Sequence, residues 1–242
     1  MKKFQLLLVA IIFTTTIQAQ NWGANKVKGN GTITTITRTT ANYDIIKCAG
    51  SMDFILVKGN EGKITIEGKE NLLKHIITEV KNNTLTVKIA NKYNLQTSRN
   101  KTIKITIPFQ EISKVALAGS GSLWSTNSIN AKKLNVSLAG SGDIKLDLNS
   151  NETFASLAGS GDITLKGKST TLEANIAGSG DFDGANLQAD NTEVSVTGSG
   201  DATVVSNSTL DARVTGSGDI VYKGKPTKEQ TKIIGSGSIS NN

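Results

Sequence analysis

The amino-acid sequence predicts an all-β fold, a right-handed parallel β-helix or solenoid with coils of about 19 residues. The first observation is a Gly-Ser-Gly motif, followed by Asp or Ser, that occurs seven times between Gly119 and Ser238 at intervals of 18 to 21 residues. A period this regular indicates stacked units that bury their apolar faces against one another. The second observation is an alternation of apolar and polar residues on both sides of each motif, which is typical of β-strands.

Equivalent positions of the repeats also carry similar residues, which is the third observation. The position before the first glycine is Ala or Thr in six repeats, and the position two before it is always a large aliphatic residue. Like-on-like stacking of parallel coils predicts such columns. An antiparallel β-sandwich built from hairpin repeats also satisfies the alternation and is the alternative. The aliphatic column is Leu117, Leu138, Leu157, Ile176, Val196, Val214 and Ile233.

Each Gly-Ser-Gly motif is predicted to form a tight corner between two strands. The chain must bend sharply there, through positive φ values at which a Cβ atom would clash. The glycines of the corners are therefore expected to be structural residues. They are Gly119, Gly121, Gly140, Gly142, Gly159, Gly161, Gly178, Gly180, Gly198, Gly200, Gly216, Gly218, Gly235 and Gly237.

The first residues have the pattern of a secretory signal peptide, which we assign to residues 1–19. Lys2 and Lys3 give a basic start, residues 6–13 form an apolar run too short to cross a bilayer, and Ala19 is a small residue before the cleavage point. No later segment is long and apolar enough for a transmembrane helix. The sequence therefore predicts export to the periplasm, the outer surface or the medium, with no transmembrane segment after signal cleavage.

Residues 20–242 are predicted to form a single β-helical domain, because no Pro-rich or Gly-rich linker interrupts them. Regular repeats occupy residues 119–238. Residues 40–118 contain weakly repetitive strands and a degenerate corner at residues 50–53. Residues 76–89 are expected to form two strands joined by a polar turn.

Composition argues against nucleic-acid binding and against a disulfide-stabilised fold. The formal net charge is +7, but the lysines are scattered among acidic residues instead of forming a basic patch with aromatic partners, which argues against nucleic acid as a partner. The single cysteine, Cys48, rules out an intramolecular disulfide framework. Its position among strand residues favours a buried side chain over a reactive thiol.

No residue pattern indicates a catalytic site or a cofactor. His75 is the sole histidine and is expected to have a solvated or capping role, and the corner serines lack a partnered base. We therefore predict that the protein is not an enzyme and uses no cofactor. Because some β-helix folds host polysaccharide lyases and hydrolases, a polysaccharide-acting enzyme that uses carboxylates such as Asp181 and Asp183 is the alternative.

An aspartate follows five of the seven corners. In stacked coils, neighbouring carboxylates about 5 Å apart repel by about 0.8 kcal/mol in water, and something must offset that repulsion. One answer is a bound Ca²⁺, which would make the chain a cation-binding structural solenoid. The answer that we favour is a hydrogen bond from corner backbone N–H groups to each carboxylate. The column is Asp143, Asp162, Asp181, Asp201 and Asp219, flanked by Ser122 and Ser238.

The chain resembles an exported bacterial family known as putative auto-transporter adhesin, head GIN domain. The resemblance covers about residues 40–240 and depends on residues 44–46, 50–53, 70–73 and 77–80, and above all on the serial Ala-Gly-Ser-Gly-Asp corners. It implies a single domain with a β-helix-type fold. It supplies no established catalytic residues.

These observations together predict an exported, non-enzymatic interaction protein of the cell envelope, an adhesin or a surface scaffold. A regular solenoid offers an extended rigid surface, and its partner is expected to be a protein or a glycan. Trp124, beside the first corner, is a candidate for stacking on a ligand such as a sugar ring. Open ends of the stack would invite self-association into a homo-oligomer.

Overall fold

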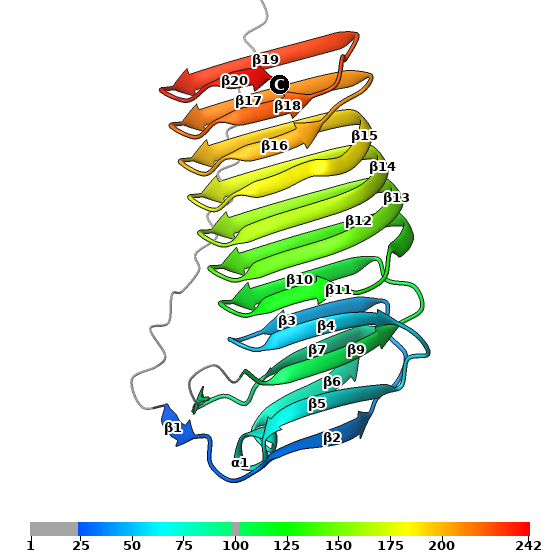
Figure 1. The fold of residues 1–242 in the computed structure, drawn as a ribbon, viewed down its shortest axis with the longest axis vertical. Coiled ribbons are helices and arrows are strands. Elements are labelled where there is room, and N and C mark those ends of the chain that lie inside the picture. Colours follow the sequence, from blue (N-terminus) through cyan, green and yellow to red (C-terminus); the bar gives the residue numbers. More distant parts are fainter. Residues whose placement is uncertain (1–23, 98–101) are drawn as a thin grey trace, which may run out of the picture.

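Figure 1 shows a computed structural model of the chain, which describes residues 24–97 and 102–242. The coils of the β-solenoid stack along the long axis of the molecule. Residues 24–113 form one end of the stack, which we call the base. The predicted signal peptide, residues 1–19, lies outside the described residues.

Each coil of the solenoid has a strand that leads into a Gly-Ser-Gly corner and a strand that leaves it. Neighbouring coils pair in parallel, and each residue lies beside its equivalent one repeat later, as Leu138 lies beside Leu157. This register confirms the parallel solenoid and excludes hairpin repeats over residues 114–241. The strands are β10 (Lys114–Gly119), β11 (Ser122–Ser125), β12 (Ile129–Gly140), β13 (Asp143–Gly159), β14 (Asp162–Gly178), β15 (Phe182–Gly198), β16 (Ala202–Val205), β17 (Thr209–Gly216), β18 (Ile220–Lys223), β19 (Lys228–Gly235) and β20 (Ile239–Asn241).

The edge opposite the corners, which we call the far edge, is continuous strand in the middle coils. β13, β14 and β15 each run from one corner to the next without a break. The polar composition of residues 149–151 and 166–168 indicates connections between strands, but these residues lie within β13 and β14, where Asn149 pairs with Lys168 and Ser150 with Ser169. Parallel backbone pairing persists there because the polar side chains of Asn149 and Lys168 turn outward and leave the ladder intact.

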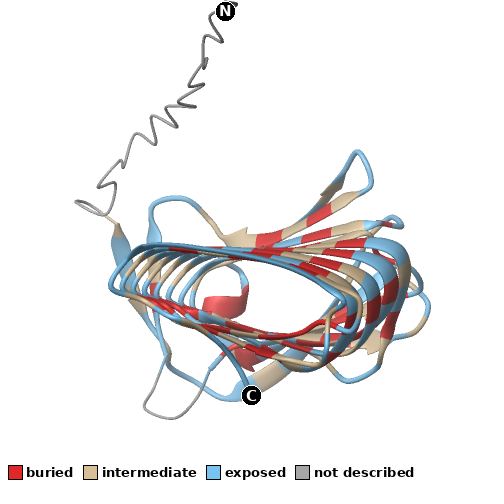
Figure 2. Cartoon of the chain, turned by 90° about the horizontal axis from the view of Figure 1, so that it is seen from above, coloured by how far each residue is buried: buried red, intermediate tan, exposed pale blue. Residues whose placement is uncertain are grey.

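The core runs along the inside of the stack, and Figure 2 shows buried segments alternating with more exposed ones along both walls. Six members of the aliphatic column, Leu117 to Val214, are no more than 2% exposed. Cys48 continues this column in the base beside Leu117 and is 2% exposed, as the sequence predicted. Burial raises the pKa of its thiol well above the ordinary value.

The base begins with a coil that the chain visits out of order. β3 and β4 flank the corner at Gly50, and this coil lies between the β10–β11 coil above and the later strands β7 and β9 below. β6 and β7 form the expected hairpin, turning through Asn82 and Asn83, which have positive φ. The base elements are β1 (Asn25–Lys28), β2 (Ile33–Thr39), β3 (Ile45–Ala49), β4 (Asp53–Lys58), β5 (Lys63–Lys69), α1 (Glu70–Leu73), β6 (Ile76–Lys81), β7 (Thr84–Ile89), β8 (Tyr93–Gln96) and β9 (Lys104–Phe109).

Antiparallel strands close the bottom of the base. β2 pairs with β5, β5 with β9, and β6 with β7, so the two walls of the solenoid end in β2 and β6. The Arg38 guanidinium of β2 donates to the carbonyl of Leu73 at 2.8 Å and to the carbonyl of Ile76, which ties the walls together. Leu72 and Leu73 of α1 are at most 2% exposed and close the core from below.

The corner glycines are required for two different physical reasons. Gly159 represents the first glycine of each corner, with a φ of 133° and an ideal Cβ position 2.2 Å from the Gly140 carbonyl oxygen. Gly161 represents the second glycine and has no positive φ, but its Cβ would lie 2.0 Å from the Gly142 carbonyl oxygen. A side chain at the first position would therefore meet both an unfavourable backbone conformation and the carbonyl of the coil below. At the second position it would meet only the carbonyl of the coil below.

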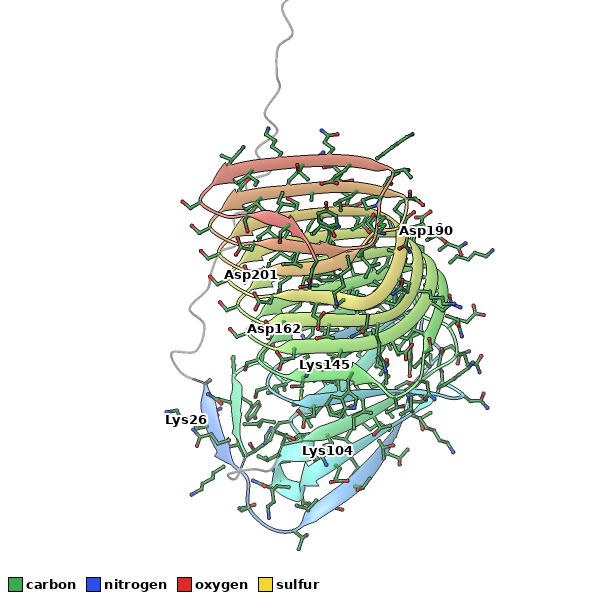
Figure 3. All side chains as sticks on the ribbon, turned by 45° about the horizontal axis from the view of Figure 1, so that its top comes forward. Lys26, Lys104, Lys145, Asp162, Asp190 and Asp201 are labelled. Atoms are coloured by element: carbon green, nitrogen blue, oxygen red, sulfur yellow. The ribbon has the colours of Figure 1, made fainter. Side chains whose placement is uncertain are left out.

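The aspartates after the corners hydrogen-bond between coils. Asp181 Oδ1 accepts from the Asp201 backbone N–H at 2.8 Å, and Asp201 Oδ1 accepts from the Asp219 N–H at 2.8 Å. Asp162 Oδ1 accepts in the same way from the Asp181 N–H at 3.1 Å. Asp162 and Asp201 lie one above the other along the corner edge in Figure 3. Asp219 Oδ1 accepts from the Ser238 N–H at 2.7 Å, so four of the five carboxylates, all except that of Asp143, pair with a corner amide of the next coil, which offsets the repulsion within the column.

Substitution of either glycine of a corner should destabilise the stack. We expect Gly159→Ala and Gly161→Ala each to lower the free energy of unfolding by about 3 kcal/mol, because the new Cβ meets backbone that cannot move without disturbing the register. In a chain of this size that loss lowers the melting temperature by about 6–12 °C. Ser160→Ala in the same corner should change the melting temperature little. Thermal melts of Gly161→Ala that match those of Ser160→Ala would refute the close-approach argument.

The aspartate column should stabilise the protein through its hydrogen bonds and not through a cation. Asp181→Ala is expected to cost about 1 kcal/mol, because the Asp201 amide loses its acceptor, whereas Asp181→Asn keeps an amide oxygen there and should cost less. Melting temperatures in excess Ca²⁺ and in EDTA at matched ionic strength should agree. A Ca²⁺-dependent rise in the parent that disappears in Asp181→Asn would show a metal site instead.

Candidate functional site

Two adjoining hollows at the far edge form the candidate site, which we call the far-edge groove. Their volumes are about 690 and 520 Å³, and they share Glu111 and Asn130. They lie where the chain passes from β9 to β10 and from β11 to β12, between the irregular base and the continuous coils above. The polar residues that line them are Asp44, Lys58, Asn60, Glu61, Gln110, Glu111, Ser113, Asn130, Lys132, Lys133, Asn149, Ser150 and Asn151.

Hydrogen bonds fix the lower wall of the groove. The Asp44 carboxylate accepts from the Ser113 backbone N–H at 3.0 Å and from its hydroxyl at 2.8 Å. Glu61 Oε2 accepts from the Tyr43 N–H at 2.9 Å, and Gln110 Nε2 donates to Asn60 Oδ1 at 3.0 Å. Burial, aided by the Glu61 charge, raises the pKa of Tyr43, so its phenol stays protonated and donates to the Pro108 carbonyl.

The upper wall carries amides that remain available to a ligand and a lysine that already has partners. Asn130, Asn149 and Asn151 make no side-chain hydrogen bond to any other described residue. Each amide offers two donors and an acceptor, which suits hydroxyl and peptide groups. Lys133 lies beside the groove with its Nζ 4.2 Å from the Phe154 ring centroid and 3.7 Å from the Glu152 carboxylate. The groove can therefore recognise a neutral or mildly charged polar polymer.

Trp124 lies outside this groove. It belongs to β11 and is paired in register with Ile55 of β4 and Lys145 of β13, on the outer face of the wall that leaves the corners. Its neighbour Leu123 points into the core, and the indole itself is partly exposed. The structure thus leaves Trp124 accessible to a ligand on that wall but does not join it to the groove.

The residues considered for catalysis are not brought together. His75 lies in the base, where its ring stacks on Tyr93 with the centroids 4.1 Å apart. Asp181 follows the corner between β14 and β15, and Asp183 belongs to β15, where its carboxylate accepts from the Ala185 N–H at 3.0 Å. Within residues 24–97 and 102–242, no three His, Cys, Asp or Glu side chains form a group that could hold a metal ion.

Sequence reasoning missed the far-edge groove, although one signal pointed to it. The interval between the first two corners, from Gly119 to Gly140, is 21 residues, the longest in the series. The additional residues fall in the connection between β11 and β12, which passes beside the groove. Reasoning from the repeats also missed Gly167, which has positive φ inside β14 and stacks over the Leu148 carbonyl at the far edge.

In the part of the chain that the structure covers, no helix is long and apolar enough to cross a membrane. Among curated proteins, none matches the chain significantly.

Several solved structures share the fold. A putative adhesin from Bacteroides fragilis NCTC 9343 is 23% identical, with a TM-score of 0.82 over 89% of this chain and 100% of that one. A putative adhesin from Parabacteroides merdae ATCC 43184 is 21% identical, with a TM-score of 0.72 over 90% of this chain and 100% of that one. A putative lipid binding protein from Parabacteroides distasonis ATCC 8503 is 28% identical, with a TM-score of 0.74 and coverage of 90% and 100%.

The family model for the putative auto-transporter adhesin, head GIN domain, matches residues 42–226. This match spans the β3–β4 coil and six of the seven regular corners. The chain therefore belongs to the head GIN domain family of putative auto-transporter adhesins.

Proposed function

We propose that the chain is an exported, non-enzymatic interaction protein of the cell envelope, an adhesin or a surface scaffold, that binds a glycan or a protein in the far-edge groove. The observation that carries the proposal is the set of unpaired amides, Asn130, Asn149 and Asn151, held on a backbone that the stack makes rigid. A rigid site binds with little loss of conformational entropy. Membership of an adhesin family supports the proposal.

A second candidate function is the binding of an acyl chain. The outer face of the wall that leads into the corners has a hollow of about 330 Å³ over small side chains, including Ala49, Ala118 and Ala139. A relative with this fold is described as a putative lipid binding protein, which supports the candidate. The hollow borders the exposed Lys47.

Removal of the groove amides should weaken partner binding and leave the fold unchanged. The test is an array of bacterial and host polysaccharides and of envelope proteins, probed with the parent and with Asn149→Ala/Asn151→Ala. We expect at least a tenfold loss of affinity for the ligands found, which corresponds to about 1.4 kcal/mol. Gln188→Ala is the matched control, because Gln188 is exposed at the far edge in register with Asn149 and Lys168 but lies outside the groove.

Two outcomes would contradict the proposed site. Binding to lipid vesicles that survives the groove substitutions and is lost in Ala139→Glu would favour the acyl-chain candidate. Cleavage of an arrayed polysaccharide, lost in a folded Asp183→Asn or His75→Ala variant, would show that the protein is an enzyme.

Export is expected to remove residues 1–19. The protein recovered from the envelope or the medium should begin at Gln20, because Ala19 precedes the predicted cleavage point. N-terminal sequencing of the fractionated protein measures this directly. A cytoplasmic protein that retains Lys2 and Lys3 would contradict the proposed location.

A further inference from the structure

The upper end of the solenoid is open in the part of the chain that the structure describes. β19 pairs with β17 along one side, β20 pairs with β18, and no described strand covers the other side of either one. β19 lies at the top of the stack in Figure 1, and all eight of its residues are exposed. A free sheet edge presents unpaired N–H and C=O groups and is a template for another strand.

The two ends of the solenoid differ in how the core is covered. At the base, the walls converge through Arg38 and the core is plugged by Leu72 and Leu73. At the upper end, the core column finishes in Ile233, which is 46% exposed, and the adjacent Ile234 is 54% exposed. The core is therefore covered at the base, whereas apolar side chains of the last coil are left in contact with water at the upper end.

The apolar surface of the upper end is confined to the half near the corner. Ile233, Ile234 and the partly exposed Ile239 lie there, on either side of the last corner. Toward the far edge, β19 carries only the polar residues 228–231. A partner of the upper end should therefore cover the corner half and leave the far half in water.

The backbone of β19 is oriented to accept a strand at Ile233. The amides of Lys228 and Ser236 donate to the coil below, to Ser208 and Gly216. In a parallel ladder alternate residues bond to opposite sides, so the amide and carbonyl of Ile233 point away from β17, toward the open edge.

We propose that this end docks on the same end of a second copy of the chain, with β19 antiparallel to β19 of that copy and a two-fold axis at Ile233. This register places Ile233 of one copy beside Ile233 of the other, and Lys232 of one beside Ile234 of the other. Side chains that face the core in one copy then lie beside side chains that face the core in the other. Moving the axis one residue to Lys232 places two lysines opposite each other, and like charges directly opposite are destabilising. The convergent base offers no matching open coil, so the association closes as a dimer and does not extend into a filament.

Solution mass and a cysteine cross-link test this proposal on the purified full chain. The parent should have the mass of a dimer by light scattering, and Ile233→Asp should raise the dimer dissociation constant at least tenfold while the variant stays folded by circular dichroism. In a Cys48→Ala background, Ile233→Cys should form a disulfide-linked dimer on oxidation, because Cα atoms about 5.5 Å apart across an antiparallel pair can be bridged.

Ile33 at the base supplies the matched control, since it is 45% exposed and also lies on a strand with one unpaired side. Ile33→Asp should leave the dimer intact, and Ile33→Cys should not cross-link. A parent that is monomeric at all concentrations would overturn the proposal and show that Lys228 and Lys232 protect the edge from pairing. Filaments, or equal cross-linking at Ile33 and Ile233, would overturn the two-fold arrangement.

Discussion

The structure depends on the close approach of one backbone to the next at the corners. Carbonyl oxygens of one coil occupy the space in which a Cβ atom of the next coil would lie, as Gly140 does beneath Gly159. This contact fixes the register of both walls. Once two corners are stacked, the parallel strands that enter and leave them can pair in one register only. The aliphatic columns and the aspartate hydrogen bonds follow from that register.

The sequence predicted the regular part of the fold well, because there a single repeat determines both local bend and long-range pairing. It predicted less of the base, where pairing depends on a chain path that visits β3 before β7 and packs Arg38 against Ile76, and neither follows from local patterns. The far-edge groove was missed for a similar reason. Asn130 and Glu111 are distant in sequence and ordinary in type, and they become a site only when two irregular connections lie side by side.

The asymmetry of the stack connects the fold to the proposed functions. The base closes one end of the solenoid, and the groove lies where the base meets the regular coils. The opposite end leaves Ile233 and Ile234 in water. Partner binding and self-association would therefore use surfaces at different heights along one rigid axis. Two copies joined at their open ends would display two grooves pointing away from the shared interface, an arrangement suited to bivalent contact with an extended surface.

The central claim is that equivalent residues stack in register, one coil per repeat. Pulsed electron paramagnetic resonance measures it directly, with spin labels at the exposed corner serines Ser120, Ser199 and Ser236 in a Cys48→Ala background. At about 4.8 Å per coil, backbone positions should be separated by about 19 Å between Ser120 and Ser199, which are four coils apart, and by about 29 Å between Ser120 and Ser236, which are six coils apart. Distances that do not increase with the number of intervening coils would contradict the stacked solenoid.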